Sequence, residues 1–126
     1  MTDQRDTLYA DSYADPVAAA GRFSFDANVA SVFPDMIKRS VPGYETIIAM
    51  TGTLAERYVQ ANSRCYDLGC SLGASSIAMR HHIQQPGCEI ISVDNSEAML
   101  KQCQAVLQQD DKDKTTALAP VELICG

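Results

Sequence analysis

The heptapeptide DLGCSLG at residues 67–73 restricts the fold of this chain more than any other segment, because it separates a short apolar run from a pattern with helical spacing. Its glycines allow backbone conformations and close ligand approaches that a Cβ would hinder. A helix that begins directly after such a loop points free N–H groups and a positive dipole end at whatever lies on the loop. The segment therefore predicts a strand, a loop that grips a nucleoside-bearing ligand, and a helix, in that order.

Strand and helix patterns alternate from this region onward. The predicted elements are strands at 64–67, 89–93 and 121–125, helices at 74–85 and from Asn95 or Ser96 to 108, and a solvated loop at 110–114. Parallel strands joined by helices of this length form right-handed crossovers. The predicted fold class is therefore α/β, with helices followed by β-α-β-α-β of a parallel sheet, which is half of a doubly wound sheet. Because parallel sheets are normally larger and covered on both faces, we expect this chain to be the N-terminal part of a longer protein.

Three parts of the chain differ in composition. Residues 1–21 are predicted to form a polar N-terminal arm, and residues 22–62 an N-terminal helical segment. Residues 63–126 are predicted to form the first half of a cofactor-binding domain.

The helical segment carries its own signals. Asp26 is expected to cap a short helix that runs to Phe33, and Pro34 to start a second short helix at 35–39. A longer amphipathic helix is expected at 44–59. The residues that recur at helical spacing on its apolar face are Ile47, Ile48, Thr51, Leu54, Ala55 and Tyr58.

Charge and cysteine content exclude several classes of protein. The net charge of −6 argues against broad binding of a nucleic-acid backbone, which requires a basic face. No apolar run approaches the roughly 18 residues of a membrane span, and the first residues do not resemble a secretory signal. The five cysteines are odd in number and lack C-x-x-C spacing, so we expect reduced thiols and a cytoplasmic protein.

A second element strengthens the prediction of a nucleoside site. Asp94 ends the second predicted strand, 21 residues after Gly73. An acidic side chain at that point lies beside the loop and can accept hydrogen bonds from both hydroxyls of a ribose. The alternative is that Asp94 only caps the next helix.

The spacing within the loop indicates which nucleoside ligand it suits. A dinucleotide loop usually reads G-x-G-x-x-G, whereas this chain has D-x-G-x-S-x-G. The pattern resembles the first motif of the S-adenosylmethionine-dependent methyltransferase superfamily, with Ser71 in place of the usual middle glycine. The acidic Asp67 is expected to support the loop or, through water, the ammonium group of the ligand.

A longer resemblance is more specific. The stretch FPDMIKRSVPGY at residues 33–44, together with CYDLGCSLG at 65–73 and VDNS at 93–96, resembles the carboxy-S-adenosyl-L-methionine synthase family. Arg5-Asp6-Thr7-Leu8 also matches. The resemblance covers nearly all of this chain but only about the first half of a family member, and it implies a Rossmann-like methyltransferase fold.

The resemblance implies a carboxyl-transferring transferase. Members of this family bind S-adenosyl-L-methionine as a substrate and convert it, with prephenate, to carboxy-S-adenosyl-L-methionine and phenylpyruvate. A separate tRNA carboxymethyltransferase uses the product to modify the wobble uridine to its 5-oxyacetic acid form. The resemblance further implies a cytoplasmic homodimer that needs no metal, no membrane and no direct contact with nucleic acid.

The family motif also assigns ligand-binding residues. The resemblance implies that six residues contact the methionine end, the ribose or the adenine of S-adenosyl-L-methionine. They are Tyr44, Gly69, Cys70, Ser71, Asp94 and Asn95. The resemblance assigns no catalytic residue. Other family residues, an acid after position 126, a later asparagine and an arginine that holds a ligand carboxylate, have no counterpart here.

Several alternatives stay open on sequence alone. The chain is also compatible with an ordinary S-adenosylmethionine-dependent small-molecule methyltransferase and with a non-catalytic cofactor-binding fragment. Instead of contacting the ligand, Tyr44 could pack its helix against the sheet. Instead of contacting the ligand through its backbone, Cys70 could be a reactive thiol. His81 and His82 are adjacent on a helix and face different ways, so they are not expected to bind a metal together.

Overall fold

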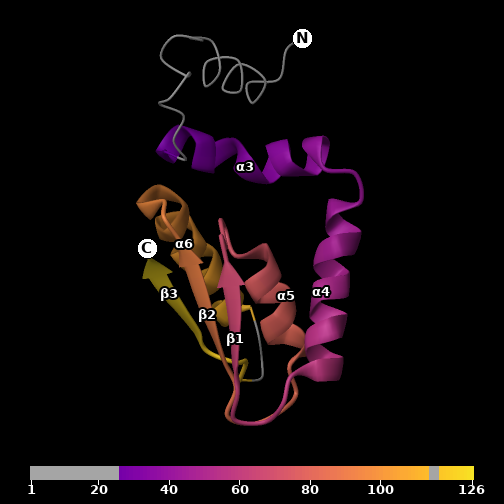
Figure 1. Ribbon diagram of the computed structural model, residues 1–126. Coiled ribbons are helices and arrows are strands. Elements are labelled where there is room, and N and C mark those ends of the chain that lie inside the picture. Colours follow the sequence, from indigo (N-terminus) through magenta and orange to yellow (C-terminus); the bar gives the residue numbers. More distant parts are fainter. Residues whose placement is uncertain (1–25, 114–116) are drawn as a thin grey trace.

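The structure, a computed structural model, describes residues 26–113 and 117–126, and its elements follow the predicted alternation (Figure 1). The elements of this described part are α3 Ala27–Ser40, α4 Tyr44–Tyr58, β1 Arg64–Leu68, α5 Ala74–His82, β2 Glu89–Asp94, α6 Glu97–Lys112 and β3 Val121–Cys125. The predicted arm at residues 1–21 lies outside the described residues. Among the described helices, none has the length and apolar character that crossing a membrane requires.

The three strands form one parallel sheet in the order β1-β2-β3. In the register of the sheet, Cys65 lies beside Ile90, and Ile90 lies beside Val121. The carboxyl ends of the strands, and the loops that follow them, therefore share one edge. This incomplete Rossmann-like α/β arrangement confirms the predicted fold class.

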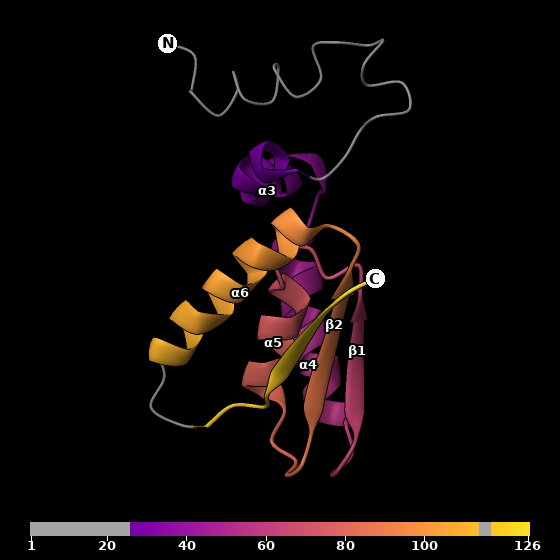
Figure 2. The same ribbon diagram turned by 90° about the vertical axis from the view of Figure 1, so that its left-hand side faces the viewer.

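Helices cover one face of the sheet (Figures 1 and 2). Helix α5 contacts β2, helix α6 contacts β2 and β3, and helix α4 packs along α5. Between the sheet and α6, the side chains of Ile90, Met99 and Cys103 are completely buried and form the centre of the core. On the opposite face no helix of the described part packs, and Tyr66 and Leu68 of β1 are exposed.

Helix α3 is continuous, so the prediction of two short helices separated at Pro34 is wrong. Pro34 has no N–H group, and the carbonyl of Ala30 therefore lacks its usual partner four residues later. The helix continues because its flanking turns are stabilised by packing: Val29 and Val32 are buried, and α3 contacts α6. The Asp26 carboxylate caps the helix as predicted, accepting from the amide of Val29 at 3.0 Å.

Helix α6 extends to Lys112, so the predicted loop at 110–114 is wrong over its first three residues. The physical reason is an ion-pair cluster with the end of α5. The buried guanidinium of Arg80 donates to Asp110 at 3.3 Å and to Asp111 at 2.9 Å, and His81 contacts Asp110 at 2.8 Å. These contacts stabilise a last turn that the charge pattern alone does not favour.

Helix α4 has its predicted bounds to within one residue, but only part of its predicted apolar face packs: Ala55 is buried and Ile48 and Thr51 are half-buried. Gly52 and Ala55 are buried, whereas Ile47, Leu54 and Tyr58 are exposed. Gly52 is the cause, because a Cβ there would lie 2.7 Å from Cδ2 of His82 and 3.0 Å from the carbonyl oxygen of Ala78. The helices pack closely where that side chain is absent.

Helix α5 ends at His82, three residues before the predicted end. Ile83 already has an extended backbone, and its N–H donates to the carbonyl of Met79. The turn that follows is held to the start of β1, because the amide of Asn62 donates to the carbonyl of Pro86 at 2.9 Å. That contact, together with the restriction that Pro86 places on the preceding residue, ends the helix early.

Candidate functional site

The glycine loop lies at the carboxyl edge of the sheet and is fastened to β2. The amides of Gly69 and Cys70 both donate to the carbonyl of Val93, at 2.8 and 2.9 Å. The amide of Gly73 donates to the carbonyl of Cys70 at 2.8 Å, which closes the turn before α5 begins. Gly73 has φ +87°, and a Cβ there would lie 2.7 Å from the sulfur of Cys103. Its conformation and its surroundings therefore both require glycine.

Ser71, which stands in place of the motif's usual middle glycine, has a left-handed conformation with φ +52°, one that glycine adopts without strain. Its amide donates to Oδ2 of Asp94 at 2.9 Å. The other carboxylate oxygen, Oδ1, accepts from the amide of Ser96 at 2.9 Å. Asp94 thus bridges the loop and the start of α6.

The role of Asp94 as the helix cap, the alternative left open by the sequence, belongs instead to Ser96. Ser96 is the N-cap residue of α6, and its hydroxyl oxygen accepts from the amide of Met99 at 3.2 Å. An ionised carboxylate can accept about four hydrogen bonds. Since Asp94 uses two of these positions, it retains capacity for a ligand.

Two cavities adjoin the loop. The first, of about 330 Å³, lies between the loop and helices α3 and α4; the second, of about 510 Å³, lies over the ends of β1 and β2. Gly69 and Ser71 line both cavities, so the loop separates two lobes of one site. Volumes of this size are typical of small-molecule sites.

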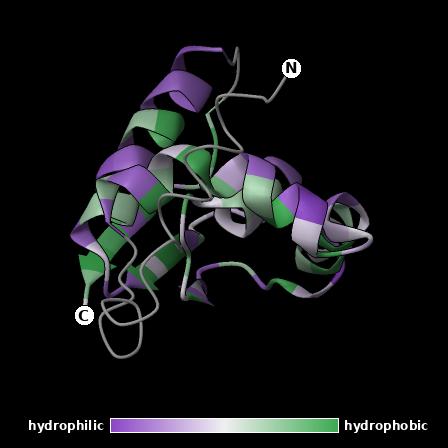
Figure 3. Cartoon of the chain, turned by 90° about the horizontal axis from the view of Figure 1, so that it is seen from above, coloured by the Kyte–Doolittle hydropathy of each residue, from purple (hydrophilic) through white to green (hydrophobic). Residues whose placement is uncertain are grey.

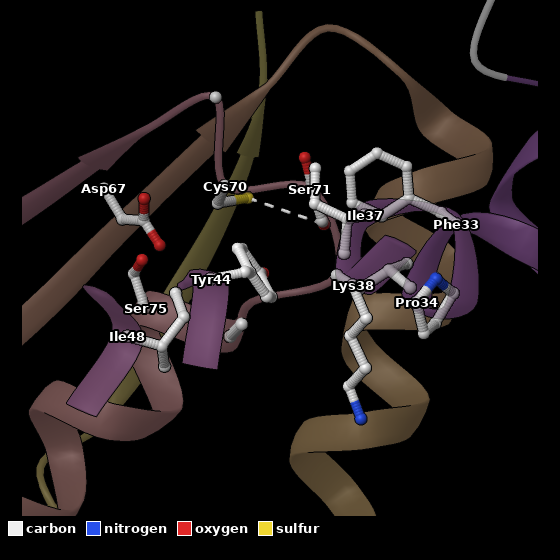
Figure 4. A pocket seen from close by; sticks show the side chains of 13 residues that line it. Phe33, Pro34, Ile37, Lys38, Tyr44, Ile48, Asp67, Cys70, Ser71 and Ser75 are labelled. Atoms are coloured by element: carbon white, nitrogen blue, oxygen red, sulfur yellow. Dashed lines mark hydrogen bonds between the residues drawn. The ribbon is translucent and has the colours of Figure 1, made fainter. Parts of the chain in front are cut away.

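The structure brings all six sequence-predicted ligand residues to these cavities. The first cavity is lined by Tyr44, Gly69, Cys70 and Ser71, and the second by Gly69, Ser71, Asp94 and Asn95. Tyr44 is the first residue of α4, and its side chain reaches the first cavity beside Cys70 (Figure 4). The 26 positions that separate Gly69 from Asn95 along the chain are closed because parallel strands end at one edge, whereas Tyr44 reaches the site from α4, which packs along α5.

The sequence did not predict the apolar wall of the first cavity. Phe33, Pro34 and Ile37 of α3 and Ile48 of α4 line it (Figure 4). Helix α3 lies beyond the carboxyl ends of the strands (Figures 1 and 2), and Figure 3 gives the view from this end of the molecule. The motif FPDMIKRSVPGY indicated a family resemblance, but nothing in its spacing indicated that α3 crosses the site.

Asp67 supplies the acidic group of the first cavity. Its Oδ2 accepts from the hydroxyl of Ser76 at 2.7 Å, and Ser76 in turn contacts the hydroxyl of Ser92 at 2.6 Å. Within residues 26–113 and 117–126, no basic side chain forms an ion pair with Asp67. Burial and, to a smaller extent, the charge of Asp67 raise the pKa of Tyr44 above its usual 10.0, so its phenol is neutral near pH 7.

Cys70 is buried beneath the loop. Its hydrogen bond with Cys103, followed by burial, raises the pKa of the Cys70 thiol, and the same hydrogen bond lowers the pKa of Cys103. Cys70 therefore keeps its proton at neutral pH and lacks the thiolate character of a nucleophile. Its amide donates to the carbonyl of Val93, its carbonyl accepts from the amide of Gly73, and its thiol is bonded to Cys103, so the second lone pair of the carbonyl is the group left for a ligand.

The two histidines contact different helices. Nε2 of His81 lies 2.8 Å from Asp110 of α6, and Nδ1 of His82 lies 3.2 Å from Glu56 of α4. Their rings therefore diverge, as their adjacency on α5 predicted.

Comparisons with known proteins show where the sequence belongs. No family model matches the chain. It is 52% identical over 122 residues to the carboxy-S-adenosyl-L-methionine synthase of Klebsiella pneumoniae, an alignment that covers 97% of this chain and 46% of the relative. It is 58% identical over 103 residues to the enzyme of the same name from Marinobacter nauticus, covering 82% of this chain and 39% of the relative.

A solved structure supports the fold. A crystal structure from Methanococcus maripaludis, described as an S-adenosyl-L-methionine-dependent methyltransferase, aligns with a TM-score of 0.58 and 18% identity. The alignment covers 82% of this chain and 42% of that chain. The chain spans less than half the length of the curated relatives it matches. In sequence, most of this chain is therefore similar to carboxy-S-adenosyl-L-methionine synthases, at 52% and 58% identity to these two relatives.

Proposed function

We propose that this chain forms part of the S-adenosyl-L-methionine site of a carboxy-S-adenosyl-L-methionine synthase. The observation that carries the proposal is the pair of cavities joined across Gly69 and Ser71, with an acidic residue in each lobe. Asp67 lies in the first lobe and Asp94 in the second. A ligand with a positive charge at one end and a ribose at the other matches this distribution.

The residues present fit that ligand. A Cβ at Gly69 would meet no protein atom within 4 Å, and because Gly69 lines both cavities, that free space leaves room for a ligand to pass between the lobes. In this proposal Asp94 accepts from the ribose hydroxyls and Asn95 contacts the adenine side. Ser71, Cys70 and the neutral phenol of Tyr44 contact the methionine side.

The chain's own contribution to the reaction is positioning and exclusion of water. S-adenosyl-L-methionine, when bound, supplies an activated methyl group on a cationic sulfur. Phe33, Pro34 and Ile37 give the first cavity an apolar wall, and apolar surroundings strengthen the attraction between Asp67 and a positive charge. The raised pKa of the Cys70 thiol keeps it protonated, and the proposal needs no protein nucleophile.

We further propose the reaction and partners that go with the family. The second substrate is prephenate, and the products are carboxy-S-adenosyl-L-methionine and phenylpyruvate. The first product serves a tRNA carboxymethyltransferase that modifies the wobble uridine, and the whole enzyme is a cytoplasmic homodimer. Identities of 52% and 58% to proteins named carboxy-S-adenosyl-L-methionine synthase support this proposal.

The experiment that tests the function has two arms. In the first, the whole protein that carries this sequence is incubated with S-adenosyl-L-methionine and prephenate, and mass spectrometry is expected to detect both products. Turnover that does not depend on prephenate, with S-adenosylhomocysteine and a methylated acceptor as products, would instead identify an ordinary methyltransferase. In the second arm, calorimetry measures ligand binding by the 126-residue chain and its Asp94→Asn variant; binding without turnover would indicate a cofactor-binding module.

A further inference from the structure

Two fully buried serines lie behind Asp67. Ser76 of α5 and Ser92 of β2 are both 0% exposed. The hydroxyl of Ser76 donates to Oδ2 of Asp67 at 2.7 Å and lies 2.6 Å from the hydroxyl of Ser92. Each hydroxyl has one proton. Since the proton of Ser76 goes to Asp67, Ser76 must accept the proton of Ser92, and the chain of bonds runs from Ser92 through Ser76 to Asp67.

The position of these serines requires an explanation. Ser92 lies on the helix-facing side of the sheet, as does the completely buried Ile90, and Ser76 meets it from α5. A buried hydroxyl is costly unless it is hydrogen-bonded, and a pair of apolar side chains would fill the same space without that cost. The chain of hydrogen bonds through the two serines instead ends on the carboxylate of Asp67, so its last bond is charge-assisted.

The bond leaves one carboxylate oxygen available. In the described part of the chain, Ser76 bonds to Oδ2, and no hydrogen bond reaches Oδ1. No buried side-chain oxygen or nitrogen lacks a partner there, so Oδ1 is accessible from the cavity that Asp67 lines. Asp67 is also the one acid among the described residues that line this cavity, and the amine of Lys38 is paired with Glu45 at 3.4 Å.

We propose that Ser76 is a positioning residue that, with Ser92 behind it, fixes the Asp67 carboxylate so that Oδ1 meets a positive charge of the bound ligand. The inference rests on the proposed function, because it takes S-adenosyl-L-methionine as that ligand. The ligand offers two positive groups, its ammonium and its sulfonium. Both attract a fixed carboxylate, and binding experiments with analogues separate them.

The test measures the affinity of the 126-residue chain for three ligands by calorimetry. S-adenosyl-L-methionine carries both charges, S-adenosylhomocysteine carries only the ammonium, and methylthioadenosine carries neither. Ser76→Ala is expected to weaken binding of S-adenosyl-L-methionine by about tenfold, on the scale of a lost hydrogen bond to a charged group, and to leave methylthioadenosine unchanged. An equal loss for S-adenosylhomocysteine identifies the ammonium; no loss identifies the sulfonium.

Three further variants separate positioning from a general structural effect. Ser76→Thr keeps the hydroxyl and is expected to retain most of the affinity. Ser31→Ala removes an exposed hydroxyl that donates to the carbonyl of Asn28 in the same helix at 2.7 Å, and it is expected to change nothing. In an Asp67→Asn background, Ser76→Ala is expected to cause little further loss, because the two residues act through one contact.

Clear results would overturn the proposal. Equal weakening of all three ligands by Ser76→Ala would show a structural role, and unchanged affinity for S-adenosyl-L-methionine would show no role. If Ser76→Ala does not melt cooperatively, Ser92→Ala provides the second test, with a smaller loss expected in the same direction. If the wild-type chain binds none of the three ligands, the proposed function itself fails, which is a different result from wild-type binding that Ser76→Ala leaves intact.

Discussion

Replacing Gly52 by alanine tests the close packing of α4 on α5. An added Cβ would lie 2.7 Å from Cδ2 of His82 and 3.0 Å from the carbonyl oxygen of Ala78. The His82 ring can move, because its main partner is the half-exposed Glu56. The Ala78 oxygen belongs to the backbone of α5 and can move only if the helices separate.

The magnitude follows from two opposing effects. Overpacking of this kind costs about 1–3 kcal/mol. Alanine is favoured over glycine within a helix by about 1 kcal/mol. The net effect is the cost of overpacking minus the gain in helix propensity. Because the backbone contact cannot relax locally, we expect a net loss of about 1–2 kcal/mol in the free energy of unfolding of the Gly52→Ala variant.

Urea denaturation followed by circular dichroism measures this loss. Thr53→Ala is the matched control, because Thr53 is exposed on the same helix and its hydroxyl donates to the carbonyl of Ala49 within that helix. Combining Gly52→Ala with His82→Ala should restore part of the loss, since it removes the ring contact and keeps the backbone contact. A Gly52→Ala variant more stable than wild type would refute the argument that this glycine sets the distance between the helices.

Three other predictions concern single side chains. Arg80→Ala leaves Asp110 without its buried partner and is expected to cost about 3 kcal/mol in urea denaturation, with faster amide exchange in the last turn of α6; unchanged exchange there would contradict this. Ser71→Gly removes a left-handed non-glycine conformation and should raise the free energy of unfolding by up to about 1 kcal/mol, measured the same way. Because the folded-state pKa of Tyr44 is raised above 10.0, the corresponding stability is fully present below that pH and is lost as the pH rises through the folded-state pKa; the urea midpoint of Tyr44→Phe should fall less steeply in this range than that of wild type.

The main elements could be predicted from sequence because their signals are local. The strand and helix patterns after residue 63 gave the parallel sheet, and the glycine loop gave its ligand edge. The errors in the bounds of α3, α5 and α6 arose from contacts that the local sequence does not show. Packing of Val29 and Val32 carries α3 past Pro34, and Arg80 extends α6 from 30 positions away along the chain.

The residues of the candidate site likewise fall into those that local sequence predicts and those that depend on contacts between distant elements. Residues at strand ends, such as Asp94, were predictable because parallel topology alone brings strand ends together. The apolar wall was not, because the path of α3 over the site depends on its contact with α6. The serines behind Asp67 were also missed, since a buried serine and an exposed one look alike in a sequence.

Asp94 shows that a structural role and a ligand-binding role can depend on each other. The sequence presented them as alternatives. In the structure, the bond from the amide of Ser71 holds the loop in its left-handed turn, and the bond from Ser96 holds the start of α6. These two bonds also fix the carboxylate at the second cavity before any ligand arrives. A carboxylate that is already oriented loses less conformational entropy when it binds a ribose, so the structural bonds of Asp94 favour the proposed contact.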